Sequence, residues 1–285
     1  MKSLIALSLL LCIASAFEIR GPGNTQRERL GSMVQKVVVS SRITNGQTAA
    51  ANSFPYQAGL KFYNGVKFNF CGGSLISKKW VLTAAHCTLN AISVTVYLGS
   101  INIADPIVHL EVDQCDIKAH PEFHNELNQN DIALIKIPAV TYSATIKPVS
   151  LPKCASSYPN YVDETVVASG WGKTSDASKS CSPVLQFANL KVISNEVCVR
   201  TYGTAKIQAG KMCTATINRI GSCDGDSGGP LVLASSNLQI GIMSFCHHSG
   251  CEADKPAGHT RVTSYLQWIQ QNTGIRLENN NCLFL

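Results

Sequence analysis

Residues 225–230 read Gly-Asp-Ser-Gly-Gly-Pro, and this hexapeptide is the most informative one in the 285-residue chain. A serine hydroxyl attacks a carbonyl well only when a base takes its proton and N–H groups receive the developing negative charge. Glycines beside Ser227 let the backbone turn tightly and aim the N–H groups of Gly225 and Ser227 at one point. The stretch therefore predicts a nucleophilic serine with an oxyanion hole.

Two further stretches supply the partners that such a serine needs. Residues 82–87, Leu-Thr-Ala-Ala-His-Cys, offer His86 as a base, and residues 130–134, Asn-Asp-Ile-Ala-Leu, place Asp131 just before an apolar run. Taken alone, His86 reads as a core histidine and Asp131 as a solvated turn acid. The order histidine, aspartate, serine is one of several that build the same catalytic constellation on unrelated folds. Together the three stretches predict a catalytic triad.

These stretches, with Ile43 and residues 71–75 (Cys-Gly-Gly-Ser-Leu), resemble the trypsin/chymotrypsin family of serine proteases across nearly all of residues 43–275. Residues 257–263, Ala-Gly-His-Thr-Arg-Val-Thr, resemble its secreted insect digestive members in particular, of the chymotrypsin/elastase-like kind. The resemblance implies a serine endopeptidase, a hydrolase of peptide bonds.

The fold class follows from the strand pattern and from the resemblance. Short apolar or alternating runs between turn residues occur at 80–84, 92–98, 132–137 and 238–245. Such runs with little helix between them favour an all-β barrel or sandwich. The resemblance specifies two packed six-stranded antiparallel β-barrels, about 43–150 and 151–262, with the triad in the cleft between them.

One helix is expected, over about 264–273 at the end of the second barrel. Apolar side chains recur there at helical spacing, in Tyr265, Leu266, Trp268 and Ile269. Thr263 or Ser264 is the expected cap at its start, and Gly274 the residue that ends it.

The resemblance also assigns roles by position. His86 acts as general base and then general acid, Asp131 orients it, and Ser227 is the nucleophile, with the Gly225 and Ser227 amides as oxyanion hole. Ser244 steadies Asp131, and Ser244, Phe245 and Cys246 pair with the substrate backbone as an added strand. The implied disulfides are Cys71–Cys87, Cys198–Cys213 and Cys223–Cys251. The resemblance gives no partner for Cys115, Cys154, Cys181, Cys246 or Cys282, although a Cys154–Cys282 pair is one alternative.

The first 42 residues predict processing in two steps. Residues 1–16 combine Lys2, an apolar run and the small residues Ala-Ser-Ala, which is the pattern of a secretory signal peptide too short to span a bilayer. Residues 17–42 form a polar propeptide, and residues 43–285 the peptidase domain. The resemblance implies that a trypsin-like protease cleaves between Arg42 and Ile43. The new Ile43 ammonium then pairs with Asp226, so the precursor is expected to be nearly inert.

Specificity depends on the pocket for the side chain before the cut. Trypsin-like relatives carry an aspartate where this chain has Gly221, so a substrate Lys or Arg would leave an unpaired buried charge. Cys246 and Ala257 stand where chymotrypsins usually have glycine and narrow the slot, whereas Gly221 and Ser222 leave depth. A medium-sized apolar residue is the expected preference. Asp224 is expected at the pocket rim, either attracting basic groups that flank the cut or as a solvated acid.

Composition excludes several other classes. The formal net charge is +6, but beyond residue 42 only 18 basic and 16 acidic residues remain, so no nucleic-acid partner is expected. No stretch outside the signal peptide predicts a membrane span. A zinc site at residues 246–251 is disfavoured because Cys251 is committed to a disulfide, and residues 100–111 lack a calcium-binding carboxylate pattern. Neither metal nor other cofactor is expected.

The twelve cysteines and the signal peptide predict a secreted, extracellular protein, and we expect it to be a monomer. Its expected partners are protein or peptide substrates, the activating protease and protein inhibitors of proteases. Two alternatives to a digestive peptidase remain: a non-catalytic binding protein on the same scaffold, and a regulatory protease of a zymogen cascade. The latter usually carries a folded module before the protease domain, for which residues 17–42 are too short.

Overall fold

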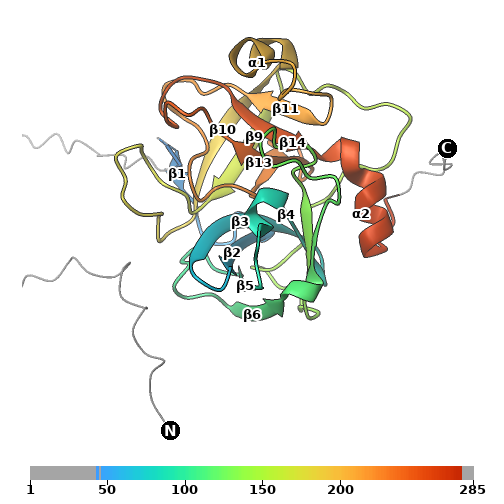
Figure 1. Ribbon diagram of the computed structural model, residues 1–285. Coiled ribbons are helices and arrows are strands. Elements are labelled where there is room, and N and C mark those ends of the chain that lie inside the picture. The colour runs from blue at the N-terminus through green and yellow to red at the C-terminus, as the bar shows by residue number, and fades with distance from the viewer. Residues whose placement is uncertain (1–42, 45, 278–285) are drawn as a thin grey trace, which may run out of the picture. The chain divides into compact units, whose positions relative to one another are not determined.

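The computed structural model describes residues 43–44 and 46–277. The predicted signal peptide and propeptide, with Arg42, lie outside the described residues, as does Cys282. Two antiparallel sheets carry the fold (Figure 1). Among the described residues, no helix is long and apolar enough to cross a membrane.

The first sheet closes through one bent strand. Its strands are β2 (Gln57–Tyr63), β3 (Phe68–Ser77), β4 (Trp80–Thr83), β5 (Ser93–Leu98), β6 (Val108–Asp113), β7 (Ile117–Ala119) and β8 (Ala133–Lys136), in the order β6-β5-β2-β3-β4-β8-β7. Only the 3₁₀ turn Gln114–Asp116 separates the two edge strands β6 and β7 along the chain. Counted as one strand bent at this turn, they make the sheet a six-stranded barrel.

The second sheet closes by direct pairing. Its strands are β1 (Gln47–Thr48), β9 (Thr165–Gly170), β10 (Gln186–Ile193), β11 (Lys211–Thr214), β12 (Pro230–Leu233), β13 (Gln239–Phe245) and β14 (Ala257–Arg261), in the order β1-β10-β11-β14-β13-β12-β9. Because β9 also pairs with β10, six strands form a ring and β1 adds to it from outside. The expected chymotrypsin-like pair of six-stranded barrels is confirmed.

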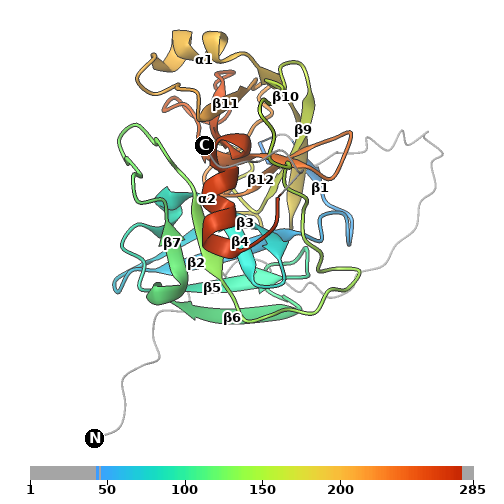
Figure 2. The same ribbon diagram turned by 90° about the vertical axis from the view of Figure 1, so that its right-hand side faces the viewer.

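The two barrels exchange segments at the ends of the described chain. Ile43 is wholly buried in the apolar cluster of the second barrel, Thr44 Oγ1 donates to Gly221 O at 2.9 Å, and β1 pairs with β10. Conversely, α2 (Leu266–Thr273) follows the second barrel along the chain (Figure 2). Its Leu266 and Ile269 belong to an apolar cluster formed mostly by the first barrel. Ile43, Thr44 and β1 therefore contact the second barrel, although the expected boundaries place them in the first.

The helices differ from expectation in two respects. A 3₁₀ turn, Val262–Tyr265, leads into α2, and neither Thr263 nor Ser264 caps it with a side chain, so that expectation was wrong. Gly274 does end the helix, in the left-handed conformation with φ 71°. A second helix, α1 (Asn195–Tyr202), was not expected; the Ser194 side chain caps it by accepting from Val197 N.

Candidate active site

Pairing of β4 with β8 brings His86 to Asp131. Thr83 at the end of β4 lies opposite Ala133 at the start of β8, so the segments beyond these residues meet. The 3₁₀ turn Ala85–Thr88 carries His86 there. Its Nδ1 lies 2.8 Å from Asp131 Oδ2, and its backbone N–H donates to Oδ1 at 2.9 Å. One carboxylate thus fixes both the ring and the main chain of the histidine.

The Asp131 carboxylate is wholly buried and remains ionised. Ser244 Oγ, on β13, donates a further hydrogen bond to Oδ2. Burial raises the pKa of Asp131, but His86, Lys211 and Ser244 lower it more, so the net pKa lies below the usual range. A buried anion against Nδ1 holds the tautomer in which Nε2 is free to accept a proton.

Ser227 lies in a turn whose backbone conformation requires glycine at positions 225 and 228. Gly225 and Gly228 have φ of 93° and 80°, in the left-handed region. A Cβ on Gly228 would lie 2.2 Å from Thr83 Oγ1 and 2.6 Å from Gly72 O. The turn is thereby packed directly against the end of β4, from which His86 follows.

The N–H groups in this turn divide into two sets. Those of Asp226, Gly228 and Gly229 donate to backbone oxygens at 2.8–3.0 Å. Those of Gly225 and Ser227 donate to no acceptor within the described part of the chain. Two neighbouring unsatisfied donors beside a serine can receive the negative charge that develops on a substrate oxygen.

Cys87 marks the place where His86 and Ser227 approach each other. Its Sγ lies 3.7 Å from His86 Nε2 and 3.6 Å from Ser227 O. Within the described residues no hydrogen bond joins Ser227 Oγ to Nε2. Such bonds are often long before substrate binds and shorten in the complex.

Asp226, beside the serine, is a wholly buried acid that has no cationic partner among the described residues. Its oxygens accept from Gly172 N at 2.8 Å and Cys223 N at 2.9 Å. No Lys, Arg or His nitrogen of the described chain lies within 4.0 Å of it. Burial raises the pKa of Asp226 to about 7.

A cavity of ≈ 240 Å³ opens at Ser227. It is lined by Ser222, Cys223, Asp224, Ser227, Met243, Ser244, Phe245 and Cys246. Five of the residues expected to bind substrate are in this set, but Gly221 and Ala257 are buried and do not line it. Met243 was missed, because inside an apolar strand it reads as core. Lys173 Nζ pairs with Asp224 at 2.9 Å, so this rim carboxylate is already neutralised in part.

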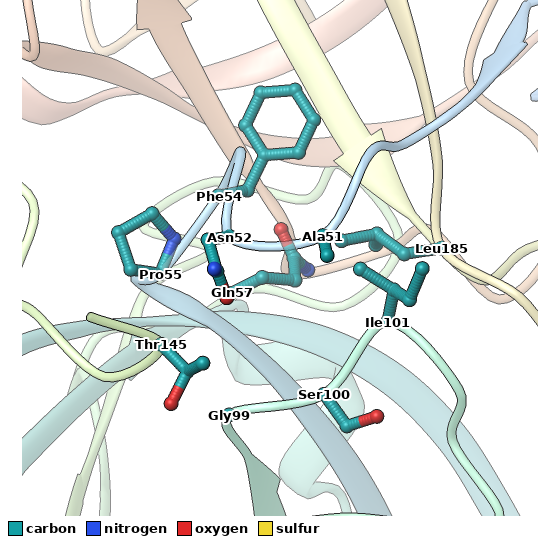
Figure 3. Close-up of a pocket in the computed structure, with 10 residues that line it drawn as sticks. All are labelled: Ala51, Asn52, Phe54, Pro55, Gln57, Gly99, Ser100, Ile101, Thr145 and Leu185. Atoms are coloured by element: carbon teal, nitrogen blue, oxygen red, sulfur yellow. The ribbon is translucent and has the colours of Figure 1, made fainter. Parts of the chain in front are cut away.

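Two more cavities lie elsewhere in the described chain. One, of ≈ 300 Å³, is lined by His86 and Cys87 together with residues of β2, β3 and their loops. The other, of ≈ 230 Å³, lies between the segment before β2, residues 99–101, Thr145 and Leu185 (Figure 3). Its polar side chains are amides and hydroxyls (Asn52, Gln57, Ser100 and Thr145), without an acid, a base or an activated nucleophile. The chemistry therefore points to the cavities at Ser227 and His86.

Three disulfides link the pairs that the resemblance implies: Cys71–Cys87, Cys198–Cys213 and Cys223–Cys251. Cys246 Sγ lies 3.8 Å from Cys251 Sγ without a bond to it. The two groups of side chains near enough to share a metal ion in the described chain, Cys71–His86–Cys87 and Asp176–Cys223–Cys251, each contain two sulfurs of one disulfide. Disulfide sulfurs are not thiolates, so neither group is a metal site.

Comparison with known proteins agrees with this geometry. The family model described as Trypsin matches residues 43–269. A collagenase of Hypoderma lineatum is 41% identical over 278 residues, covering 96% of this chain and 99% of that protein. Brachyurin of Leptuca pugilator is 40% identical over 235 residues, covering 82% of this chain and 99% of its own. The solved structure of HL collagenase matches with a TM-score of 0.76 and 42% identity, over 81% of this chain and 98% of that one. The chain belongs to the trypsin family and is a serine endopeptidase.

Proposed function

We propose that His86, Asp131 and Ser227 are the catalytic triad of this endopeptidase, and that the enzyme is a secreted, digestive-type peptidase made as a zymogen. The main support for the triad is the hydrogen bond from His86 Nδ1 to the buried Asp131 carboxylate. Ser227 lies nearby, in a turn where two N–H groups have no acceptor among the described residues.

The reaction proceeds through an acyl-enzyme. Ser227 Oγ attacks the carbonyl carbon of the peptide bond while His86 Nε2 takes the hydroxyl proton. The N–H groups of Gly225 and Ser227 donate to the resulting oxyanion. His86 then gives its proton to the leaving amine, the C–N bond breaks, and a water activated in the same way releases the acid product. No cofactor takes part.

Activation follows from the two buried groups on the second barrel. Cleavage after Arg42 converts the Ile43 nitrogen from an amide to an ammonium. Ile43 is already buried against the second barrel, and Asp226 is a buried acid with no cation beside it in the described part of the chain. We infer that the new ammonium pairs with Asp226 and thereby fixes the turn of the oxyanion hole.

The stability of the uncleaved precursor is expected to fall as pH rises from about 4 to about 7. The pKa of Asp226 is about 7 when folded and about 4 when unfolded, so the folded state binds the proton more tightly. The stabilisation that comes from protonated Asp226 is complete below pH 4 and is lost as pH approaches 7. The free energy of unfolding then falls by up to about 4 kcal/mol.

Urea unfolding of the Ser227→Ala precursor, which cannot digest itself, measures this contribution. The Ser227→Ala/Asp226→Asn double variant is the control, because other carboxyl groups titrate equally in both proteins. The difference in free energy of unfolding between the two should change with pH. A constant difference across this range would contradict the unpaired buried acid.

The pocket favours medium-sized apolar residues such as Leu and Met before the cut. Cys246 and Met243 occupy its walls, and its one lining carboxylate, Asp224, is paired with Lys173 at the rim. No buried carboxylate lines the cavity to receive Lys or Arg, which argues against trypsin-like cleavage. Since Ala257 does not line the cavity, the narrowing of the slot is assigned to Cys246.

The test is hydrolysis of a peptide panel varied only at the residue before the cut, with precursor before and after brief trypsin treatment and trypsin inhibition. We expect activity only after treatment, with Leu and Met preferred over Arg. Cys246→Gly should raise the Phe-to-Leu ratio of kcat/KM by about tenfold, because the ring gains room. Collagen belongs in the panel because one relative is a collagenase.

Three outcomes would redirect the proposal. No hydrolysis despite a sequenced Ile43 terminus would favour the non-catalytic binding protein, which labelling of Ser227 by an acylating reagent would then check. A preference for Arg or Lys would overturn the pocket assignment. Full activity without cleavage would overturn the zymogen.

We also propose where the enzyme acts and which proteins bind it. The predicted signal peptide and three disulfides suit an oxidising, extracellular destination. We propose that the enzyme acts as a monomer, that a separate trypsin-like protease activates it, and that protein inhibitors bind its cleft. The activator is another enzyme because this pocket does not suit Arg42.

A further inference from the structure

Lys211, the first residue of β11, is a wholly buried lysine close to the active site. Its side chain is among the largest fully buried ones of the described chain. Lysine is almost never fully buried unless its charge is paired. Yet no carboxylate oxygen of the described residues lies within 4.0 Å of Nζ. The groups around it must therefore explain why the charge is tolerated.

Its hydrogen bonds lead to both ends of the short segment that carries Asp131. Nζ donates to Asn128 O and, at 3.4 Å, to Thr260 Oγ1. Thr260 Oγ1 in turn donates to Asp131 O at 2.8 Å. Asn128 and Asn130 both have φ of 52°, in the left-handed region, which is uncommon outside glycine although asparagine enters it more readily than most residues. Lys211 supplies one of the contacts that hold this conformation.

The charges around Lys211 leave Asp131 as its electrostatic partner. The titratable groups that interact electrostatically with its ammonium are Asp131 before β8, Lys206 before β11 and His259 on β14. Asp131 is the only carboxylate among them. Burial, helped by Lys211, lowers the pKa of His259 to about 3, so that ring is neutral.

The interaction works in both directions. Burial lowers the pKa of Lys211 to about 8, although Asp131 opposes this. Lys211 therefore keeps its charge at neutral and acidic pH. Lys211 is also one of the groups that lower the pKa of Asp131.

We propose that Lys211 is a positioning residue of the active site, whose buried ammonium holds residues 128–131 in place and offsets part of the Asp131 charge that acts on His86. The inference rests on the proposed triad.

A positive charge beside Asp131 disfavours protonation of His86. With Lys211 in place, the general base therefore stays unprotonated down to a lower pH. Removing the charge favours the imidazolium. The acidic limb of the pH profile of kcat/KM should then move to higher pH.

Three substitutions separate charge from hydrogen bonding. Lys211→Gln keeps a donor for Asn128 O without charge, Lys211→Met removes both, and Lys211→Arg keeps both. We expect the acidic limb of the cleaved enzyme to move up by about half a unit to one unit in the Gln and Met variants and to stay in place in the Arg variant. Lys211→Met should also lower the plateau of kcat, because Asn128 O loses its donor. Lys191→Gln, at an exposed lysine paired with Asp163, is the matched control with an unchanged profile.

The pH position of the acidic limb distinguishes this role from a purely structural one. A purely structural role would lower kcat at all pH values without moving the acidic limb. A limb that stays in place in whichever neutral variants fold, or that moves equally in the Arg variant, would overturn the proposal. A wild-type enzyme that is inactive after cleavage, or shows no acidic limb, would instead contradict the triad itself.

Discussion

Asp131→Asn is expected to lower kcat about ten-thousandfold at neutral pH, the largest loss that a near-isosteric change can cause here. The reason lies in the contacts of the two carboxylate oxygens. Oδ1 accepts from the His86 backbone N–H, so the new amide nitrogen must replace Oδ2. There it faces His86 Nδ1 and donates to it, which places the ring proton on Nε2. In that tautomer the ring cannot accept the Ser227 proton.

The measurement is kcat of the cleaved variant on the preferred peptide of the panel. Asp163→Asn, at an exposed acid paired with Lys191, is the control and should retain wild-type kcat. Activity of the Asp131 variant within tenfold of wild type would remove Asp131 from the mechanism.

The second large effect is expected for Asp226→Asn in the cleaved enzyme. An amide cannot balance the Ile43 ammonium, and breaking a buried ion pair by removing one partner costs about 3 to 5 kcal/mol. If losing the pair destabilises the active conformation by this free energy, kcat/KM drops roughly a hundred- to several-thousandfold. Sequencing of the new Ile43 terminus must show that cleavage is complete, so that lost activity is not lost processing.

The same ion pair predicts how wild-type activity depends on alkaline pH. A free α-amino group has a pKa of about 8, and the Asp226 carboxylate should raise it. The active form is then complete at lower pH and is lost as pH rises through the raised pKa. In Asp226→Asn this alkaline loss should disappear from the residual activity. An Asp226 variant as active as wild type would show that the oxyanion turn forms without the pair.

The sequence predicted the parts of the site whose chemistry depends on residue type. Gly225 and Gly228 could be recognised because only glycine fits the turn around Ser227, and the motifs of His86 and Asp131 border strands that are readable as apolar runs. The strand runs at 92–98, 132–137 and 238–245 correspond to β5, β8 and β13. These features are local, so a single sequence contains them.

What the sequence could not provide depends on tertiary packing. The helix α1 is eight residues long and has one buried residue, Cys198, which a disulfide fixes to β11; without the fold its pattern is too short to stand out. Lys211 reads as a surface lysine, because nothing near it in sequence shows that Asp131 and Asn128 surround its charge. Ala257 was expected in the pocket wall, but it is buried on β14 and is not among the residues that line the cavity.

The exchange of end segments between the barrels has a consequence for how the molecule comes apart. Each half uses the other's chain to complete its apolar core: Ile43 fills the second, and Leu266 and Ile269 of α2 fill the first. Separating the halves would therefore expose core residues of both at once, unlike domains that meet at a polar, 600–1,500 Å² interface. The two barrels are therefore expected to unfold as a single cooperative unit.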